Sequence, residues 1–162
     1  MSVADELLES NAAYAAGFTG GLALRPARRL AVVACMDARL QIFPMLGLRL
    51  GDAHVIRNAG GIVRDEEIRS LTISQRLLGT EEIVLVHHTD CGMLTTTDET
   101  FRAAIRADVG DEPDWSGGFF TDLDTNVRES IARIRATPFL LHRDAVRGFV
   151  YDVTTGRLRE VV

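Results

Sequence analysis

The stretch EIVLVHHTDCG, residues 82 to 92, decides the fold class of this chain. Residues 83 to 86 form a continuous apolar run, which is typical of a strand that is buried on both faces of a parallel sheet. Polar residues follow this run without a break. The strand is therefore expected to deliver His88 and Cys91 to one end of a sheet.

Strand and helix patterns alternate on both sides of this stretch. Besides the strand at 82 to 88, strands are predicted at residues 30 to 34 and 54 to 57, and a terminal hairpin at 148 to 153 and 158 to 162. Helices are predicted at residues 3 to 18, 65 to 78, 98 to 107 and 122 to 136, and a short one at 41 to 48. This alternation predicts an α/β fold with a mainly parallel central β-sheet flanked by helices. The length suits a single domain, residues 1 to 162.

The composition excludes several classes of function. The net charge of -5 gives no overall attraction to a phosphate backbone, which argues against nucleic acid as a partner. All 18 basic residues are arginines, so neither a Schiff-base lysine nor a Walker-type lysine is present. The N-terminus lacks the pattern of a signal peptide, and no apolar run reaches the roughly 18 residues of a membrane span. A cytoplasmic location without a membrane partner is expected.

Soft metal ligands follow two of the predicted strands. Cys35 follows residues 30 to 34, and the strand at 82 to 88 ends in His88 and Cys91, in an H-x-x-C spacing. In open α/β sheets, ligands bind beyond the carboxyl ends of the strands. Two thiolates and one imidazole favour one zinc ion per subunit, with a fourth position open as in catalytic sites.

A carboxylate residue and an arginine follow Cys35 at alternate positions. Because side chains along a strand alternate between its two faces, Cys35, Asp37 and Arg39 are expected to share one face if the strand continues. Asp37 is then a competitor for the fourth position on the metal. The two cysteines are interpreted as thiols rather than as a disulfide framework.

The other three histidines are interpreted as structural. His87 is expected to point to the opposite face from His88, where it packs or forms a hydrogen bond. His54 and His142 have no neighbouring cysteines or acids that would make them ligands.

Two motifs, in the order in which they occur along the chain, resemble those of the β-class carbonic anhydrases of the short prokaryotic type. They are C-x-D-x-R (Cys35, Asp37, Arg39) and H-x-x-C-G (His88, Cys91, Gly92), with NAG between them, and the resemblance covers roughly residues 28 to 95. It implies that Cys35, His88 and Cys91 bind zinc and that Asp37 and Arg39 form a catalytic dyad. It also implies a homodimer or dimer of dimers, with the first helix laid on the partner subunit. Ala38 stands where many members of the family have serine.

The resemblance implies a reaction and a mechanism. A zinc-bound hydroxide would attack carbon dioxide, giving bicarbonate and a proton. Asp37 is expected to accept a hydrogen bond from the hydroxide, while Arg39 holds Asp37 ionised and away from the metal. In a closed state Asp37 would itself bind zinc. Because hydroxide competes better as pH rises, activity is expected on the alkaline side.

Glycine-bearing segments are assigned to the substrate pocket, since glycine lets the backbone approach a ligand closely. The residues are Asn58, Ala59, Gly60, Gly61 and Gly92. An equally simple interpretation makes residues 58 to 61 only a strand-to-helix turn.

Three other functions remain open. The same zinc site could hydrolyse carbonyl sulfide or carbon disulfide. It could be a structural, permanently closed site in a protein that is not an enzyme. A thiol redox protein using Cys35 and Cys91 is the third, although their spacing is not C-x-x-C.

Overall fold

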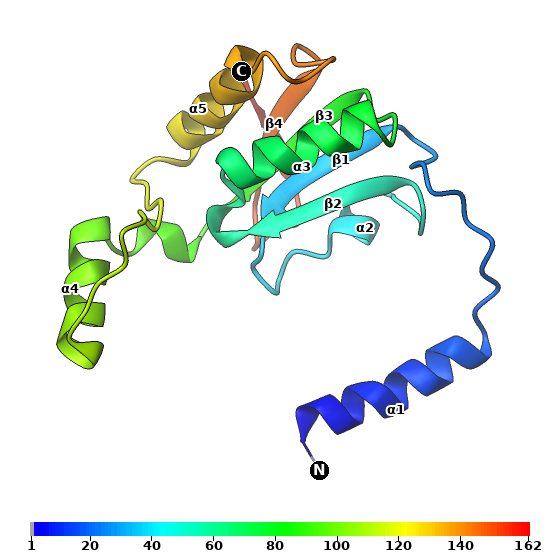
Figure 1. The fold of residues 1–162 in the computed structure, drawn as a ribbon, viewed down its shortest axis with the longest axis horizontal. Coiled ribbons are helices and arrows are strands. Elements are labelled where there is room, and N and C mark those ends of the chain that lie inside the picture. Colours follow the sequence, from blue (N-terminus) through cyan, green and yellow to red (C-terminus); the bar gives the residue numbers. More distant parts are fainter. Residues whose placement is uncertain (1) are drawn as a thin grey trace.

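The computed structural model describes residues 2–162, in which five strands form one sheet in the order β2-β1-β3-β4-β5. The strands are β1 (Leu30–Cys35), β2 (Ala53–Asn58), β3 (Glu82–His88), β4 (Val146–Tyr151) and β5 (Leu158–Val161). The first four are parallel, and β5 pairs with β4 in the antiparallel direction. The predicted parallel sheet and its terminal hairpin are therefore confirmed (Figure 1).

Two hydrophobic clusters cover the two faces of the sheet. One contains side chains of α3 (Asp65–Arg76) and α5 (Leu123–Ala136) packed against alternate residues of β1, β3 and β4. The other contains the remaining apolar residues of β1 and β3, together with apolar side chains of α2 (Ile42–Met45). The continuous apolar run of β3 thus feeds both clusters, as a strand buried on both faces should.

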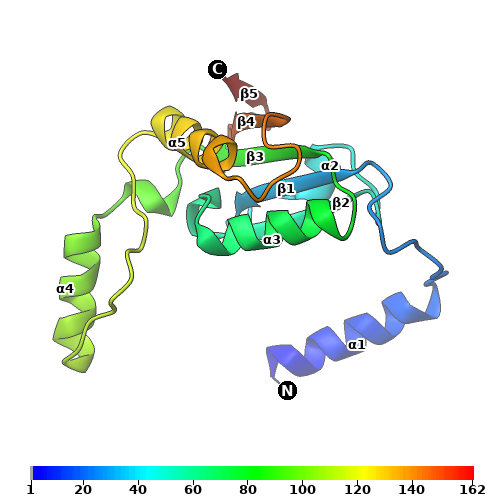
Figure 2. The same cartoon turned by 45° about the horizontal axis from the view of Figure 1, so that its top comes forward.

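Two further helices lie apart from this body. Figures 1 and 2 show α1 (Val3–Ala16) and α4 (Asp98–Val109) projecting away from the sheet. Each begins at a side-chain cap, Ser2 for α1 and Thr97 for α4, which satisfies backbone N–H groups of the first turn. Neither Val3–Ala16 nor Asp98–Val109 contains a buried residue.

The boundaries of the elements follow the predicted ones closely, and β3 coincides with its prediction. The first helix ends at Ala16 rather than at residue 18, and two short 3₁₀ helices, η1 (Ala59–Gly61) and η2 (Gly92–Leu94), were not anticipated from the sequence. None of the helices in residues 2–162 combines the length and the apolar character that a membrane crossing requires.

Candidate metal centre

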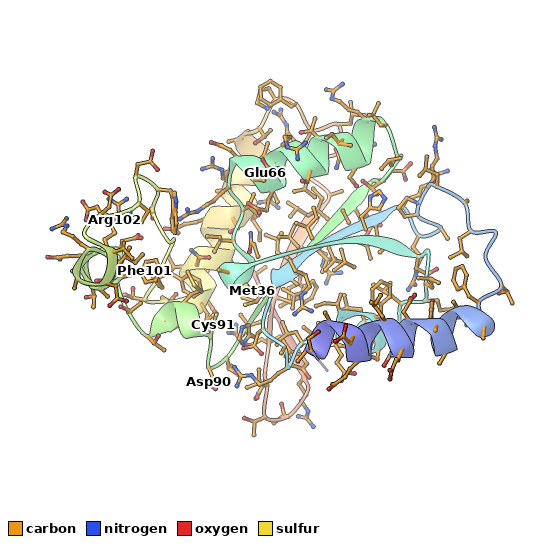
Figure 3. All side chains as sticks on the ribbon, turned by 60° about the horizontal axis from the view of Figure 1, so that its bottom comes forward. Met36, Glu66, Asp90, Cys91, Phe101 and Arg102 are labelled. Carbon is orange, nitrogen blue, oxygen red and sulfur yellow. The ribbon has the colours of Figure 1, made fainter. Side chains whose placement is uncertain are left out.

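The carboxyl ends of β1 and β3 bring three soft ligands together. The sulfur atoms of Cys35 and Cys91 and a ring nitrogen of His88 all lie within 4.8 Å of one another, and all three residues are buried. Cys35 is the last residue of β1 and His88 the last of β3, while Cys91 follows in the loop before η2. Figure 3 shows Cys91 and its neighbour Asp90 beyond the strand ends.

The geometry of these residues fits a tetrahedral metal ion. Metal–sulfur bonds of about 2.3 Å would place two sulfurs about 3.8 Å apart, and the Cys35 and Cys91 sulfurs are 4.0 Å apart. Nδ1 of His88 lies 2.8 Å from the carbonyl oxygen of Thr89. Such a contact fixes the orientation of the ring and leaves the lone pair of Nε2 free to bind a metal ion. Nε2 is buried without a hydrogen-bond partner among the described residues, as an atom reserved for a metal would be.

The protonation of the two thiols is linked. A hydrogen bond with Cys91 lowers the pKa of Cys35 to about 4, and the same interaction raises the pKa of Cys91. Burial lowers the pKa of His88, but the neighbouring Cys35 thiol and the contact with the Thr89 carbonyl outweigh this effect, so the pKa is raised overall. Binding of a cation would therefore displace protons from this cluster.

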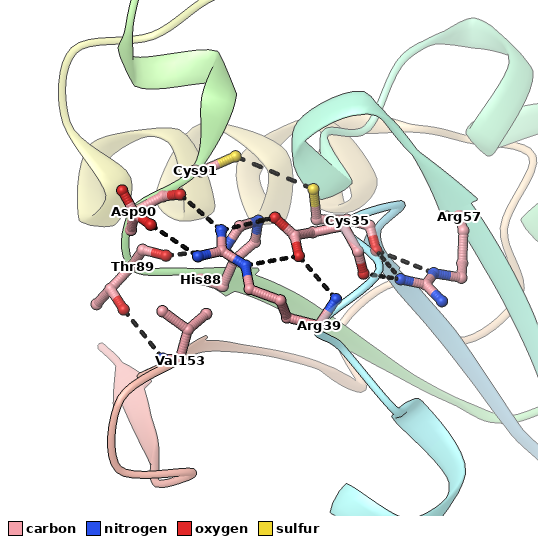
Figure 4. A network of polar contacts seen from close by, with 9 residues as sticks. Cys35, Arg39, Arg57, His88, Thr89, Asp90, Cys91 and Val153 are labelled. Carbon is pink, nitrogen blue, oxygen red and sulfur yellow. Dashed lines mark hydrogen bonds and ion pairs between the residues drawn. The ribbon is translucent and has the colours of Figure 1, made fainter.

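Asp37 is paired with Arg39 beside the cluster. Figure 4 shows Arg39 close to the candidate ligands Cys35, His88 and Cys91. Arg39 donates from Nε to Oδ1 of Asp37 at 2.9 Å and from Nη2 to Oδ2 at 2.8 Å. These bonds hold the pKa of the Asp37 carboxyl well below its usual range. Oδ2 of Asp37 lies 3.8 Å from Nε2 of His88, so the carboxylate borders the position that the three ligands surround.

The pairing does not arise in the way that the alternation along the strand predicted. That expectation required the strand to continue, and the condition is not met, because β1 ends at Cys35 and the chain turns at residues 38 and 39. The turn is closed locally, since the backbone N–H of Arg39 donates to Oδ1 of Asp37 at 2.9 Å. A turn therefore folds the guanidinium back onto the carboxylate two residues earlier.

Two residues that the sequence reasoning missed hold this turn in place. Arg57 of β2 donates to the carbonyl oxygen of Cys35 at 2.8 and 3.0 Å and to that of Asp37 at 2.6 Å. Asp90 accepts a hydrogen bond from Nη1 of Arg39 at 2.7 Å. Arg57 precedes the NAGG segment directly, and the pairing of Cys35 with Asn58 in the sheet explains its proximity to the site.

The glycine-bearing segments have different surroundings. Gly61 has a φ of +70°, and a Cβ added there would lie 2.8 Å from the backbone nitrogen of Cys35, so this glycine packs directly behind the candidate ligand Cys35. Asn58 and Ala59 line a hollow of about 270 Å³ together with Trp115. Gly60 is buried beside Phe120, and Gly92 begins η2.

The remaining histidines make hydrogen bonds away from the cluster. Nε2 of His87 lies 2.8 Å from Oδ1 of Asn126 on α5, which agrees with its predicted opposite face. Nδ1 of His54 lies 2.8 Å from Oγ of Ser74 on α3. The His142 side chain is exposed.

Known proteins resemble this chain over its whole length. The sequence profile of the carbonic anhydrase family matches residues 30–112. "Beta-carbonic anhydrase 1" of Mycobacterium tuberculosis is 54% identical over 161 residues, which cover 99% of both chains. The crystal structure of a carbonic anhydrase from Streptococcus mutans superposes with a TM-score of 0.95 at 46% identity and covers 100% of this chain and 99% of that one. A "Carbon disulfide hydrolase" of Acidithiobacillus thiooxidans is 36% identical, covering 82% of this chain and 76% of that protein.

Proposed function

Since the chain belongs to the β-carbonic anhydrase family, we propose that it catalyses the reversible hydration of carbon dioxide to bicarbonate and a proton, with one zinc ion per subunit. The observation that carries the proposal is the arrangement of Cys35, His88 and Cys91 around one point, with the Asp37 carboxylate at its border.

Zinc is the proposed ion because of the donor set. Two thiolates and one imidazole are ligands that zinc prefers, and three protein ligands leave one position open for chemistry. When bound, zinc lowers the pKa of water and so supplies the hydroxide nucleophile near neutral pH.

Asp37 is proposed to orient the nucleophile. Its carboxylate stays ionised near neutral pH because the hydrogen bonds from Arg39 lower its pKa, so it can only accept a proton or a hydrogen bond. Arg39 is proposed to restrain Asp37, because a carboxylate bound by two N–H donors is less free to turn toward the metal. The alternative arrangement, in which Asp37 becomes a fourth zinc ligand, would be inactive.

The decisive experiment is stopped-flow hydration of carbon dioxide by the zinc-loaded protein from about pH 6.5 to 9, with Asp37→Asn measured beside it. We expect activity that rises with pH in the parent and falls by about 100-fold in the variant, the usual range for a lost proton acceptor. No activity at any pH, with one equivalent of zinc bound, would overturn the proposal and favour a structural zinc site.

Hydrolysis of carbonyl sulfide or carbon disulfide is the second candidate. It is supported by the carbon disulfide hydrolases that are 34–36% identical to this chain, against 54% for the carbonic anhydrase of Mycobacterium tuberculosis. Release of hydrogen sulfide from either compound, measured beside carbon dioxide hydration, distinguishes the two. A faster turnover of the sulfur compound would make it the substrate.

A homodimer or a dimer of dimers is proposed for the assembly. Apolar side chains of α1, among them Leu7 and Leu8, are exposed in the single chain, and a partner subunit would cover them. Both cysteines are free thiols, which suits a reducing compartment, so we propose a cytoplasmic location. The proposed partner molecules are small, namely carbon dioxide and bicarbonate.

A further inference from the structure

Arg39 divides its hydrogen bonds between two acidic residues. Besides its two side-chain bonds to Asp37, it donates from Nη1 to Oδ2 of Asp90 at 2.7 Å and from Nη2 to the carbonyl oxygen of Asp90 at 2.9 Å. Four of the five guanidinium N–H groups are thus committed, two to each residue. Figure 4 shows the Arg39 guanidinium next to Asp90, with dashed lines for the bonds between them.

Asp90 has a backbone conformation that non-glycine residues rarely adopt. Its φ is +55°, and within residues 2–162 the only other non-glycine residue with a positive φ is Arg29. This left-handed conformation is unfavourable for most residues with a Cβ, and aspartate and asparagine tolerate it better than the others. It lets Asp90 present its carbonyl and its carboxylate to the same guanidinium.

Packing does not explain why an aspartate occupies this position. The Asp90 side chain is 78% exposed, so its removal would leave no cavity. An exposed ion pair contributes little to stability, and a glycine would adopt the same φ without steric cost. The benefit of aspartate must therefore lie in its effect on Arg39.

We propose that Asp90 is a positioning residue, which anchors the Arg39 guanidinium from the side opposite Asp37 and thereby keeps Asp37 in its orientation at the metal centre. This inference rests on the proposed carbonic anhydrase function. Asp90 touches neither substrate nor metal in this role, and it acts only through Arg39.

Asp90→Gly and Asp90→Asn test the anchor, with Arg29→Gly as the matched control. Arg29 also combines a positive φ with a charged side chain in an exposed ion pair, but it precedes β1 at the opposite end of the sheet. Each zinc-loaded variant is compared in kcat, zinc content and Tm. The exchange rate of the Arg39 Nε–H group, assigned by NMR through its absence in Arg39→Lys, reports on the pairing with Asp37 independently of activity.

We expect Asp90→Gly to lower kcat by about tenfold through misplacement of Asp37, with full zinc content and a Tm at or above that of the parent. Exchange of Arg39 Nε–H should accelerate. Asp90→Asn, which tolerates the same φ and keeps a neutral acceptor, should lose about threefold. Arg29→Gly should leave kcat and the exchange rate unchanged.

Two results would overturn the inference. One is an Arg39 Nε–H exchange rate that is the same in Asp90→Gly as in the parent. The other is faster exchange with no loss of kcat relative to Arg29→Gly. A parent protein without hydratase activity would instead overturn the proposed function, and the exchange rates would still decide whether Asp90 anchors Arg39.

Discussion

Cys91 and Asp37 lie at the same candidate metal centre, and the chemistry of their side chains supports the two different roles proposed for them. A buried thiol beside Cys35, which binding of a cation would deprotonate, has the properties of a metal ligand. A carboxylate whose two oxygens are both engaged by Arg39 has those of a hydrogen-bond acceptor beside the metal. Substitutions at these two residues should therefore affect the metal content and the activity of the protein differently.

Cys91→Ala should lose both zinc and activity, whereas Asp37→Asn should keep one equivalent of zinc and lose about 100-fold in kcat. Zinc is measured by elemental analysis after gel filtration, and kcat by stopped flow. Full zinc in Cys91→Ala would contradict the ligand assignment, and zinc loss in Asp37→Asn would make Asp37 a ligand of the resting state.

His87 and His88 offer a comparison between adjacent residues on opposite faces of one strand. His88→Ala should remove zinc, because Nε2 of His88 faces the two thiols. His87→Ala should keep zinc but lose about 2–3 kcal/mol of the free energy of unfolding, since it leaves a cavity and an unpaired Asn126. Urea unfolding and elemental analysis check both, and equal zinc contents would refute the distinction.

At the scale of elements, close packing against the strand ends places the ligands. Gly61 of η1 lies against the backbone of β1 and β3, and Gly148 of β4 lies against Val127 of α5. Both positions exclude a side chain, but only the first is behind the metal centre.

Gly61→Ala should destabilise the protein by about 3 kcal/mol and also weaken zinc binding, because the new Cβ would meet the backbone of Cys35 and Val86 and requires an unfavourable φ. Gly148→Ala should destabilise by about 1–3 kcal/mol, since its Cβ would lie 2.2 Å from a methyl group of Val127, but leave zinc affinity unchanged. Competition with a zinc chelator measures the affinities. Equal zinc affinities in the two variants would show that η1 does not position Cys35.

The first turn of α5 should make stability depend on pH. Asp122 is the N-cap of α5. Hydrogen bonds from the side chain and the backbone N–H of Thr125 lower the pKa of the Asp122 carboxyl. Because the folded-state pKa is below the unfolded value of about 3.9, the stabilisation is complete above that value and is lost as pH falls through the folded pKa. Asp122→Asn keeps a cap but does not titrate, so the Tm difference between parent and variant should shrink as pH falls below about 4. A constant difference would contradict this assignment.

At the scale of the whole molecule, the exposure of α1 supports the proposed dimer. The helix makes no buried contact over Val3–Ala16, and Leu7 on it is 64% exposed. A helix with such a face is stable when another surface covers it. The second copy of this chain is the proposed partner.

Leu7→Asp should convert the dimer into a monomer, as measured by light scattering at micromolar concentration. Ala13→Asp adds the same charge on the other side of α1, six residues after Leu7 and five after Leu8, and should leave the proposed dimer intact. A parent protein that is already monomeric would contradict the proposed dimer.

The sequence by itself determined the fold class, the limits of β3 and the three candidate ligands, because strand period, helix capping and ligand type are local properties of neighbouring residues. It did not determine how Asp37 meets Arg39. Alternation along a strand predicted a shared face, whereas the chain turns after Cys35 and a local hydrogen bond makes the pair. The roles of Arg57 and Asp90 could not be predicted from the sequence either. Arg57 contacts Asp37 across 20 residues of sequence, and Asp90 contacts Arg39 across 51 residues. Only the parallel register of β2, β1 and β3 brings such distant residues within hydrogen-bonding distance, and that register is a property of the assembled sheet.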